Sequence, residues 1–256
     1  MSATADGIVR WLRGRVEVAG ARGLVVGLSG GVDSAVAARL CQMAMPRHAL
    51  GVILPCHSVP GDEADAALVA RHFGLPAVTI PLDPAYHTLM ASCEAAVRGL
   101  PAELSADLNA SDDARVRLAQ ANVKPRLRMT TLYFVANRLN YLVVGTGNRS
   151  ELAIGYFTKH GDGGVDLLPL GNLVKSEVQA LARELGVPAS VIDKAPSAGL
   201  WLGQTDEGEM GFTYAELEAY LRDGPRAVAP AVALKIERLG RASEHKRALP
   251  PRPDEP

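Results

Sequence analysis

The 256-residue chain lacks several features that mark common classes of protein. Its three cysteines, Cys41, Cys56 and Cys93, include no CxxC pair, so neither a zinc cluster nor a dithiol redox site is indicated. An odd number of scattered cysteines is typical of proteins in a reducing compartment. We therefore expect a cytoplasmic protein.

Long hydrophobic runs and an excess of charge are absent too. No apolar run is long enough to span a membrane, and residues 1–15 have the spacing of an amphipathic helix rather than the apolar core of a signal peptide. Lys and Arg together number 27 and Asp and Glu 28, which leaves a net charge of −1. This balance predicts no bulk binding to nucleic acid or to a membrane.

The chain also has no low-complexity linker that would divide it. We expect a single domain over residues 1–256, large enough for one core, with a fraying proline-rich tail at 248–256. Short apolar runs alternate with segments of helical spacing. The expected strands are 24–28, 48–54, 77–82 and 141–144. The main expected helices are 34–44, 62–73 with Asp62 as its N-cap, 85–100, 112–139, 175–185, and two that begin near 213 and 230.

This alternation predicts an α/β fold, a doubly wound, Rossmann-like parallel sheet with helices on both faces. Ligands in such folds bind beyond the carboxyl ends of the strands. Functional residues are therefore expected directly after Leu28, Leu54, Leu82 and Val144.

The first expected strand runs into the glycine-rich stretch GLSGGVDS, residues 27–34. Such a turn exposes backbone N–H groups at a helix start, where the helix dipole favours an anion such as phosphate. Gly30 and Gly31 let the backbone approach closely, while Ser29 and Ser34 add hydroxyl donors. Asp33 stands where a phosphate-binding lysine would be expected, which makes sense if its carboxylate holds Mg²⁺ that bridges the phosphates.

Two other phosphate-binding patterns are missing from this stretch. No lysine precedes a Ser or Thr at the helix start, as in the Walker A loop, and there is no GxGxxG. The alternative is a plain helix start, capped by Ser or Asp, whose glycines allow a tight turn. That alternative accounts for one glycine and one serine, but not for SGGVDS as a unit.

The stretch SGGVDS resembles the pyrophosphate loop of the ATP pyrophosphatases, which have an adenine nucleotide alpha hydrolase-like fold. This superfamily includes NAD synthetase, GMP synthetase, argininosuccinate synthetase and sulfur-transfer enzymes that modify RNA. The resemblance implies cleavage of ATP between the α and β phosphates. A carbonyl or carboxyl oxygen would be adenylated, and a nitrogen or sulfur nucleophile would then displace AMP.

Four further stretches resemble the NAD synthetase family, in the same order and over nearly the whole chain. They are NVKPRLRM at 122–129, GTGNRSELAIGYFTKHGDGGVDLLPLG at 145–171, KAPSAGLWLGQTDEGEMG at 194–211 and EHKR at 244–247. The resemblance implies a ligase that amidates deamido-NAD⁺ to NAD⁺ with ATP and ammonia, the final step of NAD biosynthesis. The nicotinate carboxylate would be adenylated, AMP and pyrophosphate would be released, and no side-chain nucleophile would be needed.

The same resemblance implies roles for individual residues. Asp33 and Glu151 would hold Mg²⁺. The ATP site would comprise Gly27, Leu28, Ser29, Gly30, Gly31, Val32, Asp33, Ser34, Thr146, Lys175 and Ser197. The deamido-NAD⁺ site would comprise Arg126, Lys159, Asp166, His245 and Lys246.

Each of these roles has a plainer alternative. Glu151 could be a helix-start acid that interacts with the dipole, Asp166 a loop acid that faces water, and Ser197 a turn residue. The lysines and Arg126 could be solvated surface residues. For Arg126, Ser197 and His245–Lys246, the family resemblance carries most of the assignment.

The sequence departs from many ammonia-dependent bacterial members of the family at 145–151. It reads GTGNRSE in place of GTDHAAE, which is similar to an archaeal-type or glutamine-dependent branch, and residue 197 is serine where threonine is common. The chain begins close to its first core helix, so we expect no N-terminal glutaminase domain. The expected nitrogen donor is therefore free ammonia, or ammonia from a separate glutaminase subunit.

The resemblance further implies a homodimer. The expected contact is 112–139, with Leu127, Thr131 and Val135, although a long helix packed on its own core is the alternative. Residues 196–212 are expected to form a lid that excludes water from the adenylate. Two rival functions stay open, another superfamily enzyme that acts on RNA or a different acid, and a nucleotide-binding regulator without turnover.

Overall fold

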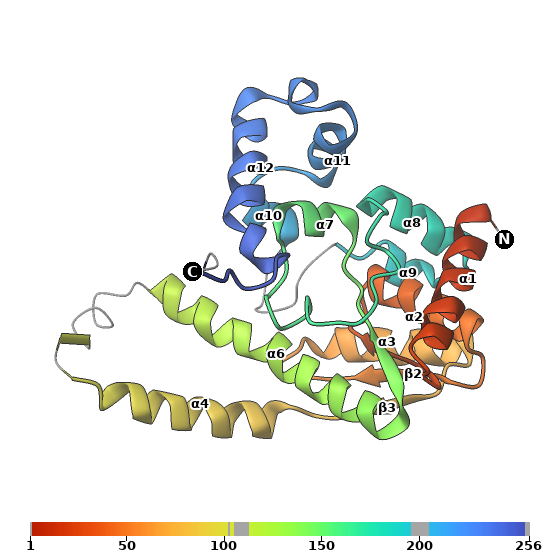
Figure 1. Ribbon diagram of the computed structural model, residues 1–256, viewed down its shortest axis with the longest axis horizontal. Coiled ribbons are helices and arrows are strands. Elements are labelled where there is room, and N and C mark those ends of the chain that lie inside the picture. Colours follow the sequence, from red (N-terminus) through yellow and green to blue (C-terminus); the bar gives the residue numbers. More distant parts are fainter. Residues whose placement is uncertain (1, 102, 105–112, 196–204, 254–256) are drawn as a thin grey trace.

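The computed structural model of the chain describes residues 2–101, 103–104, 113–195 and 205–253 (Figure 1). The described strands form one four-stranded parallel sheet in the order β3-β2-β1-β4. The strands are β1 (Gly23–Leu28), β2 (Ala49–Ile53), β3 (Ala77–Thr79) and β4 (Tyr141–Val144). The predicted parallel α/β fold is therefore confirmed.

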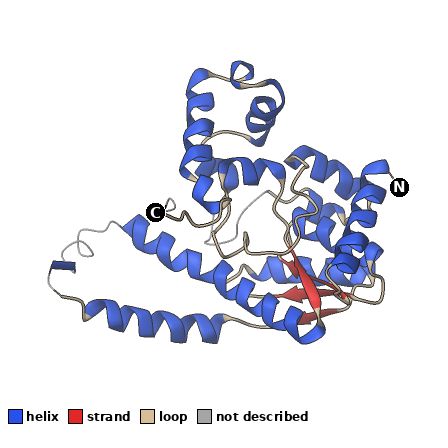
Figure 2. Ribbon diagram, viewed as in Figure 1, coloured by secondary structure: helices blue, strands red, loops and turns tan. Residues whose placement is uncertain are grey.

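Helices cover both faces of this sheet, as Figure 2 shows. One face carries α1 (Ala3–Val18), α2 (Val32–Ala44), α3 (Pro60–Phe73), α8 (Lys175–Glu184) and α9 (Ala189–Ile192). The other carries α6 (Asp113–Leu139) and the start of α4 (Asp83–Arg98). In β1, Leu24 and Val26 join the first core and Val25 the second, because successive strand residues point to opposite faces.

A third group of helices lies beyond the sheet, where α7 (Arg149–Ile154) follows β4. It comprises α7, α10 (Asp206–Met210), α11 (Tyr214–Asp223), α12 (Pro230–Ala242) and the short turns η1 (Pro225–Ala227) and η2 (Glu244–Lys246) (Figure 1). Ile154, Met210, Leu217 and Ile236 form its buried core. No helix in the described part of the chain has the length and apolar character needed to cross a membrane.

Several boundaries differ from the expected ones for identifiable reasons. Helix α3 begins at Pro60 with Val59 as its N-cap, so the prediction that Asp62 is the N-cap was wrong. The Asp62 carboxylate instead pairs with Lys194, 2.7 Å away, so a tertiary contact replaces the local cap. Strand β3 ends at Thr79 rather than at residue 82, and Pro81 stands two residues beyond this end. Proline cannot donate to a strand ladder.

The strand order places two loops at one edge of the sheet. The chain leaves β1 to build β2 on one side, while β4 pairs with β1 on the other, with Val26 opposite Val144. The carboxyl ends of β1 and β4 are therefore neighbours, and this is the switch point at which doubly wound folds bind ligands. The glycine loop after β1 and the segment 145–151 after β4 meet there.

Candidate active site

The glycine loop is a short turn held by its own serines. The Ser34 hydroxyl donates to the Gly31 carbonyl (2.9 Å) and lies 3.0 Å from the Ser29 hydroxyl, which also accepts from the Gly31 N–H (3.3 Å). Helix α2 begins at Val32, two residues before the expected start, with Gly31 as its N-cap and no side-chain cap. The first N–H groups of a helix have no acceptor within it, so those of α2 stay available to an anion.

Gly30 is the position where this loop requires glycine. Its φ is +80°, and a Cβ there would stand 2.3 Å from the Asp62 carbonyl oxygen of α3. We expect Gly30→Ala to lower the free energy of unfolding by at least about 2 kcal/mol, because left-handed backbone strain adds to the clash. Chemical denaturation measures this loss.

Gly31→Ala is the matched control for Gly30→Ala. Gly31 has an extended N-cap conformation (φ −95°, ψ 162°), and a Cβ there would meet only the Ser29 hydroxyl at 3.4 Å, an ordinary contact. We expect a loss well below that of Gly30→Ala. Equal losses for the two variants would contradict the role given to Gly30.

Asp33, in the first turn of α2, forms the centre of a charged cluster. Its Oδ2 pairs with the ammonium of Lys175, and its Oδ1 accepts from the side-chain amide of Asn148 at 3.1 Å. Lys175 is only 4% exposed. Burial lowers the pKa of Lys175, but Asp33 and Glu151 outweigh it, so the pKa lies above its ordinary value. A buried ammonium thus lies directly against the aspartate of the glycine loop.

Glu151 joins the same cluster through a capping box at the start of α7. Asn148 caps the helix by accepting from the Glu151 N–H (3.0 Å), and the Glu151 carboxylate accepts from the Asn148 N–H (3.1 Å). Burial and the negative charge of Asp33 raise the pKa of Glu151 to about 8, while Lys175 opposes the shift. The helix-start role that was an alternative for Glu151 therefore coexists with its place beside Asp33.

Four further residues of this cluster were not predicted from the sequence. Asn148 bridges Asp33 and Glu151 and is fully buried. The sequence could have indicated the role of Asn148, because Asn followed three residues later by Glu is a capping-box pattern. Asp206, Tyr214 and Ser150 also border Lys175. They come from separate segments, and nothing in their local pattern indicates that they meet.

The two acidic residues have the chemistry of a magnesium site. Within the described ranges, no group of three or more His, Cys, Asp or Glu side chains could hold a metal. Asp33 and Glu151 offer oxygen donors from two carboxylates, which Mg²⁺ commonly combines with substrate phosphates. Burial first, and then the negative charge of Asp33, raise the pKa of Glu151, and a cation would neutralise the repulsion between the two carboxylates. These residues fit the metal that the family resemblance implies.

The remaining predicted ATP residues are placed as follows. Gly27 and Leu28 end β1, Val32 opens α2, and Thr146 follows β4 at the same edge of the sheet. Ser197 and most of the predicted lid at 196–212 lie outside the described residues. Residues 206–210 of that segment form helix α10.

Four of the five predicted deamido-NAD⁺ residues gather in one place. Arg126 donates to the Lys159 carbonyl (3.3 Å), and the Lys159 ammonium donates to the His245 carbonyl (2.6 Å). The Lys246 ammonium donates to the carbonyls of Gly155 (2.7 Å) and Phe157 (2.8 Å). Lys246 thus stabilises the turn after α7 that leads to Lys159.

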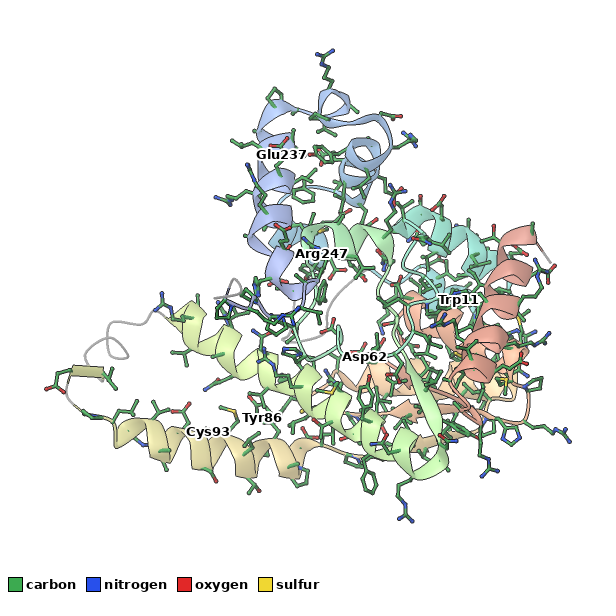
Figure 3. All side chains as sticks on the ribbon, in the orientation of Figure 1. Trp11, Asp62, Tyr86, Cys93, Glu237 and Arg247 are labelled. Atoms are coloured by element: carbon green, nitrogen blue, oxygen red, sulfur yellow. The ribbon has the colours of Figure 1, made fainter. Side chains whose placement is uncertain are left out.

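Arg247 borders this group, whereas Asp166, the fifth predicted residue, does not. Arg247, labelled in Figure 3 at the foot of α12, donates to the carbonyls of Leu152 (2.8 Å) and Gly240 (2.7 Å). Asp166 lies apart and accepts from the Tyr133 hydroxyl (2.9 Å) and the Val143 N–H (2.7 Å). The structure therefore shows Asp166 tying β4 to α6.

Comparison with known proteins supplies the family. The NAD synthase family profile matches residues 4–250. The chain belongs to the NAD synthase family. A relative from Carboxydothermus hydrogenoformans, named NH(3)-dependent NAD(+) synthetase, is 53% identical over 95% of this chain and 93% of its own length. The resemblance stated from the motifs is thus confirmed, and with it an enzyme of a ligase family.

Solved structures agree with this assignment. NMN synthetase from Francisella tularensis is 38% identical, with a TM-score of 0.87 over 100% of both chains. NAD⁺ synthetase from Burkholderia pseudomallei is 32% identical, with a TM-score of 0.75 over 96% of this chain and 90% of that one. The parallel sheet and its helical layers are therefore those of NAD synthetase structures.

Proposed function

We propose that this protein is a ligase that amidates deamido-NAD⁺ to NAD⁺, with ATP cleaved to AMP and pyrophosphate and ammonia as the nitrogen donor. One observation carries the proposal, the Asp33–Lys175 pair beside Glu151 at the start of α2. A buried ammonium and two carboxylates at a glycine loop suit a magnesium triphosphate. Membership of the NAD synthase family selects the acid substrate.

The ATP half of the site works by charge and position. The N–H groups at the start of α2 and the Lys175 ammonium neutralise phosphate oxygens. Asp33 and Glu151 would hold Mg²⁺, whose charge would offset that of the triphosphate. Thr146 contacts the nucleotide from the end of β4. These fixed charges favour departure of pyrophosphate when a carboxylate attacks the α-phosphorus.

The acid half of the site orients the second substrate. The cationic side chains of Arg126, Lys159 and Lys246, with His245 beside them, suit the phosphates of a dinucleotide. Asp166, which accepts hydrogen bonds from Tyr133 and Val143, is a further proposed substrate contact. The nicotinate carboxylate then forms an acyl adenylate. Ammonia attacks its carbonyl carbon, loses a proton, and AMP leaves with the electron pair. Positioning supplies much of the rate.

Product analysis tests this function. Purified protein is incubated with Mg-ATP and deamido-NAD⁺, with ammonium or glutamine, and the products are separated by chromatography. We expect NAD⁺, AMP and pyrophosphate in equal amounts with ammonium, and none with glutamine unless a separate glutaminase is added. ADP in place of AMP, or no NAD⁺ from folded protein that binds ATP, would overturn the proposal. Turnover itself excludes a regulator without activity.

A second candidate substrate is the corresponding mononucleotide acid. The similar structure from Francisella tularensis is named NMN synthetase, and amidation of a nicotinate mononucleotide uses the same carboxylate chemistry. The ratio of kcat/KM for the two acids decides between them. A higher value for the mononucleotide would replace deamido-NAD⁺ as the preferred substrate.

We also propose a homodimer in the reducing cytoplasm, where Cys41, Cys56 and Cys93 stay free. The expected contact residues Leu127 and Val135 pack against the protein's own sheet. The outward face of α6 instead exposes Phe134 (66%), and no described residue of α4 is buried. Figure 1 shows α4 and α6 extending together away from the sheet. A second copy would cover this apolar surface.

Phe134→Glu tests that surface. We expect the variant to elute and scatter as a monomer where the unaltered protein is a dimer, because a charge replaces an exposed aromatic ring at the contact. Val18→Glu on α1 is the control, since Val18 is 78% exposed and lies on a different helix. An unchanged mass for Phe134→Glu, or an equal change for Val18→Glu, would contradict the assignment.

A further inference from the structure

Lys175 is held from several directions besides its pairing with Asp33. It is the first residue of α8, and its N–H donates to the Ser150 hydroxyl of α7 at 3.2 Å. A lysine side chain is long and has much rotamer freedom to lose. A buried lysine that must meet a phosphate therefore benefits from a fixed backbone and a fixed ammonium.

Helix α11 contacts the side chain of Lys175 and the residue that follows it in α8. Tyr214 and Glu218 are four residues apart, which puts them on one face of the helix. Glu218 accepts two hydrogen bonds from Ser176, the residue after Lys175, one from its N–H (2.8 Å) and one from its hydroxyl (2.5 Å). A carboxylate at this helix start also interacts well with the dipole of α8.

Tyr214 contacts the ammonium end of the Lys175 side chain. Its ring centroid lies 5.4 Å from the Lys175 Nζ, within the range of a cation–π contact. Its hydroxyl donates to Asp206 Oδ2 at 2.8 Å. Asp206 is 4% exposed, and its buried Oδ1 accepts no hydrogen bond within the described part of the chain. The Tyr214–Asp206 pair therefore places a ring and a negative charge around the ammonium.

These contacts exceed what α11 needs to fold. The helix has its own capping box, in which Thr213 accepts from the Glu216 N–H (3.2 Å), and it buries Leu217 fully. Neither feature involves α8. The contact of Tyr214 with the Lys175 ammonium and the two hydrogen bonds of Glu218 with Ser176 instead converge on the first turn of α8.

We propose that Tyr214 and Glu218 are positioning residues, which together fix Lys175 for contact with the triphosphate of ATP. The inference rests on the proposed function, in which Lys175 neutralises phosphate charge. Their side-chain contacts run to Ser176, Asp206 and the Lys175 ammonium. They act through the lysine, so their loss weakens nucleotide binding rather than the chemistry of the acid.

The test measures the affinity for Mg-ATP by calorimetry, together with KM and kcat. We expect Glu218→Ala and Tyr214→Leu each to raise the dissociation constant of Mg-ATP about five- to tenfold, since each loses contacts that order a charged group. Glu218→Gln keeps one acceptor and should lose less. In a Lys175→Ala background, the further effect of Glu218→Ala should vanish, because residues that act through one partner are not additive.

Glu216→Gln is the matched control on the same helix. It weakens the capping box of α11 without touching α8, so it should lower the melting temperature but leave the Mg-ATP affinity within about twofold. An unchanged Mg-ATP affinity in folded Glu218→Ala would overturn the inference. So would a loss of affinity on adding Glu218→Ala to Lys175→Ala that equals its loss in the unaltered protein. Failure of the proposed function would give a different result, in which the variants differ in Mg-ATP affinity as expected but the protein forms no NAD⁺.

Discussion

Replacing Asp33 by asparagine is expected to lower the rate of NAD⁺ formation by about a thousandfold or more. Asparagine has nearly the shape of aspartate and can still accept from the Asn148 amide. It removes the negative charge that pairs with Lys175 and one of the two carboxylates assigned to Mg²⁺. Steady-state assays at saturating Mg-ATP measure the loss.

Asp65→Asn is the control for Asp33→Asn. Asp65 also forms a carboxylate–lysine pair, with Lys194 at 2.7 Å, but it lies on α3 and Asp62 shares the same lysine. We expect activity within about twofold of the unaltered protein, because loss of one partly exposed pair is a small change. Activity of Asp33→Asn above a tenth of normal would contradict the central role of Asp33.

The glycine-rich turn after β1 and some of the helix ends follow from local chemistry and were predictable. Gly74 adopts the left-handed conformation that ends α3, and Thr213 with Glu216 forms a capping box at the start of α11, the helix that was expected to begin near residue 213. Each depends on residues within four positions of one another, where propensity and backbone geometry decide. The NRSE stretch carried the same kind of signal, and Asn148 could have been found from it.

The surroundings of Lys175 were not predictable, because they depend on contacts distant in sequence. Asp206 and Tyr214 come from segments more than thirty positions beyond the lysine, and Ser150 from one that precedes it. Asp62 shows how such contacts override local preference. Its residue type favours an N-cap, yet its pairing with Lys194 decides its position.

The serines of the glycine loop show a related limit. Both were expected to donate hydroxyls to phosphate, yet each bonds within the loop. The Lys246 ammonium likewise donates to two backbone carbonyls after α7. A sequence indicates which groups can bind a ligand, but only the fold shows which of them already have partners.

Glu151→Gln is expected to abolish most activity and, without ligands, to make the protein more stable at alkaline pH. Burial and the Asp33 charge raise the pKa of Glu151 to about 8, so the folded state holds a proton that the unfolded state releases near its ordinary value of 4.5. The stability that this proton confers is complete below pH 4.5 and is lost as the pH rises through 8. Glutamine stays neutral and keeps an acceptor for the Asn148 N–H.

The stability gap between Glu151→Gln and the unaltered protein should therefore widen from pH 5 to pH 9, to on the order of 1–2 kcal/mol for this half-buried residue. Denaturation at several pH values measures it. Glu216→Gln provides the opposite case, because bonds from Thr213 lower the pKa of that exposed carboxyl, and its replacement should cost stability evenly over this range. A stability difference between Glu151→Gln and the unaltered protein that does not change with pH would mean that the carboxylate ionises without cost, which would contradict the prediction.

Mg-ATP should close this stability difference, because it stabilises only the protein that has both carboxylates and a ligand favours the state that binds it. The burial of the Glu151 carboxylate, together with its repulsion from Asp33, thus destabilises the ligand-free fold at the proposed binding site of a metal triphosphate.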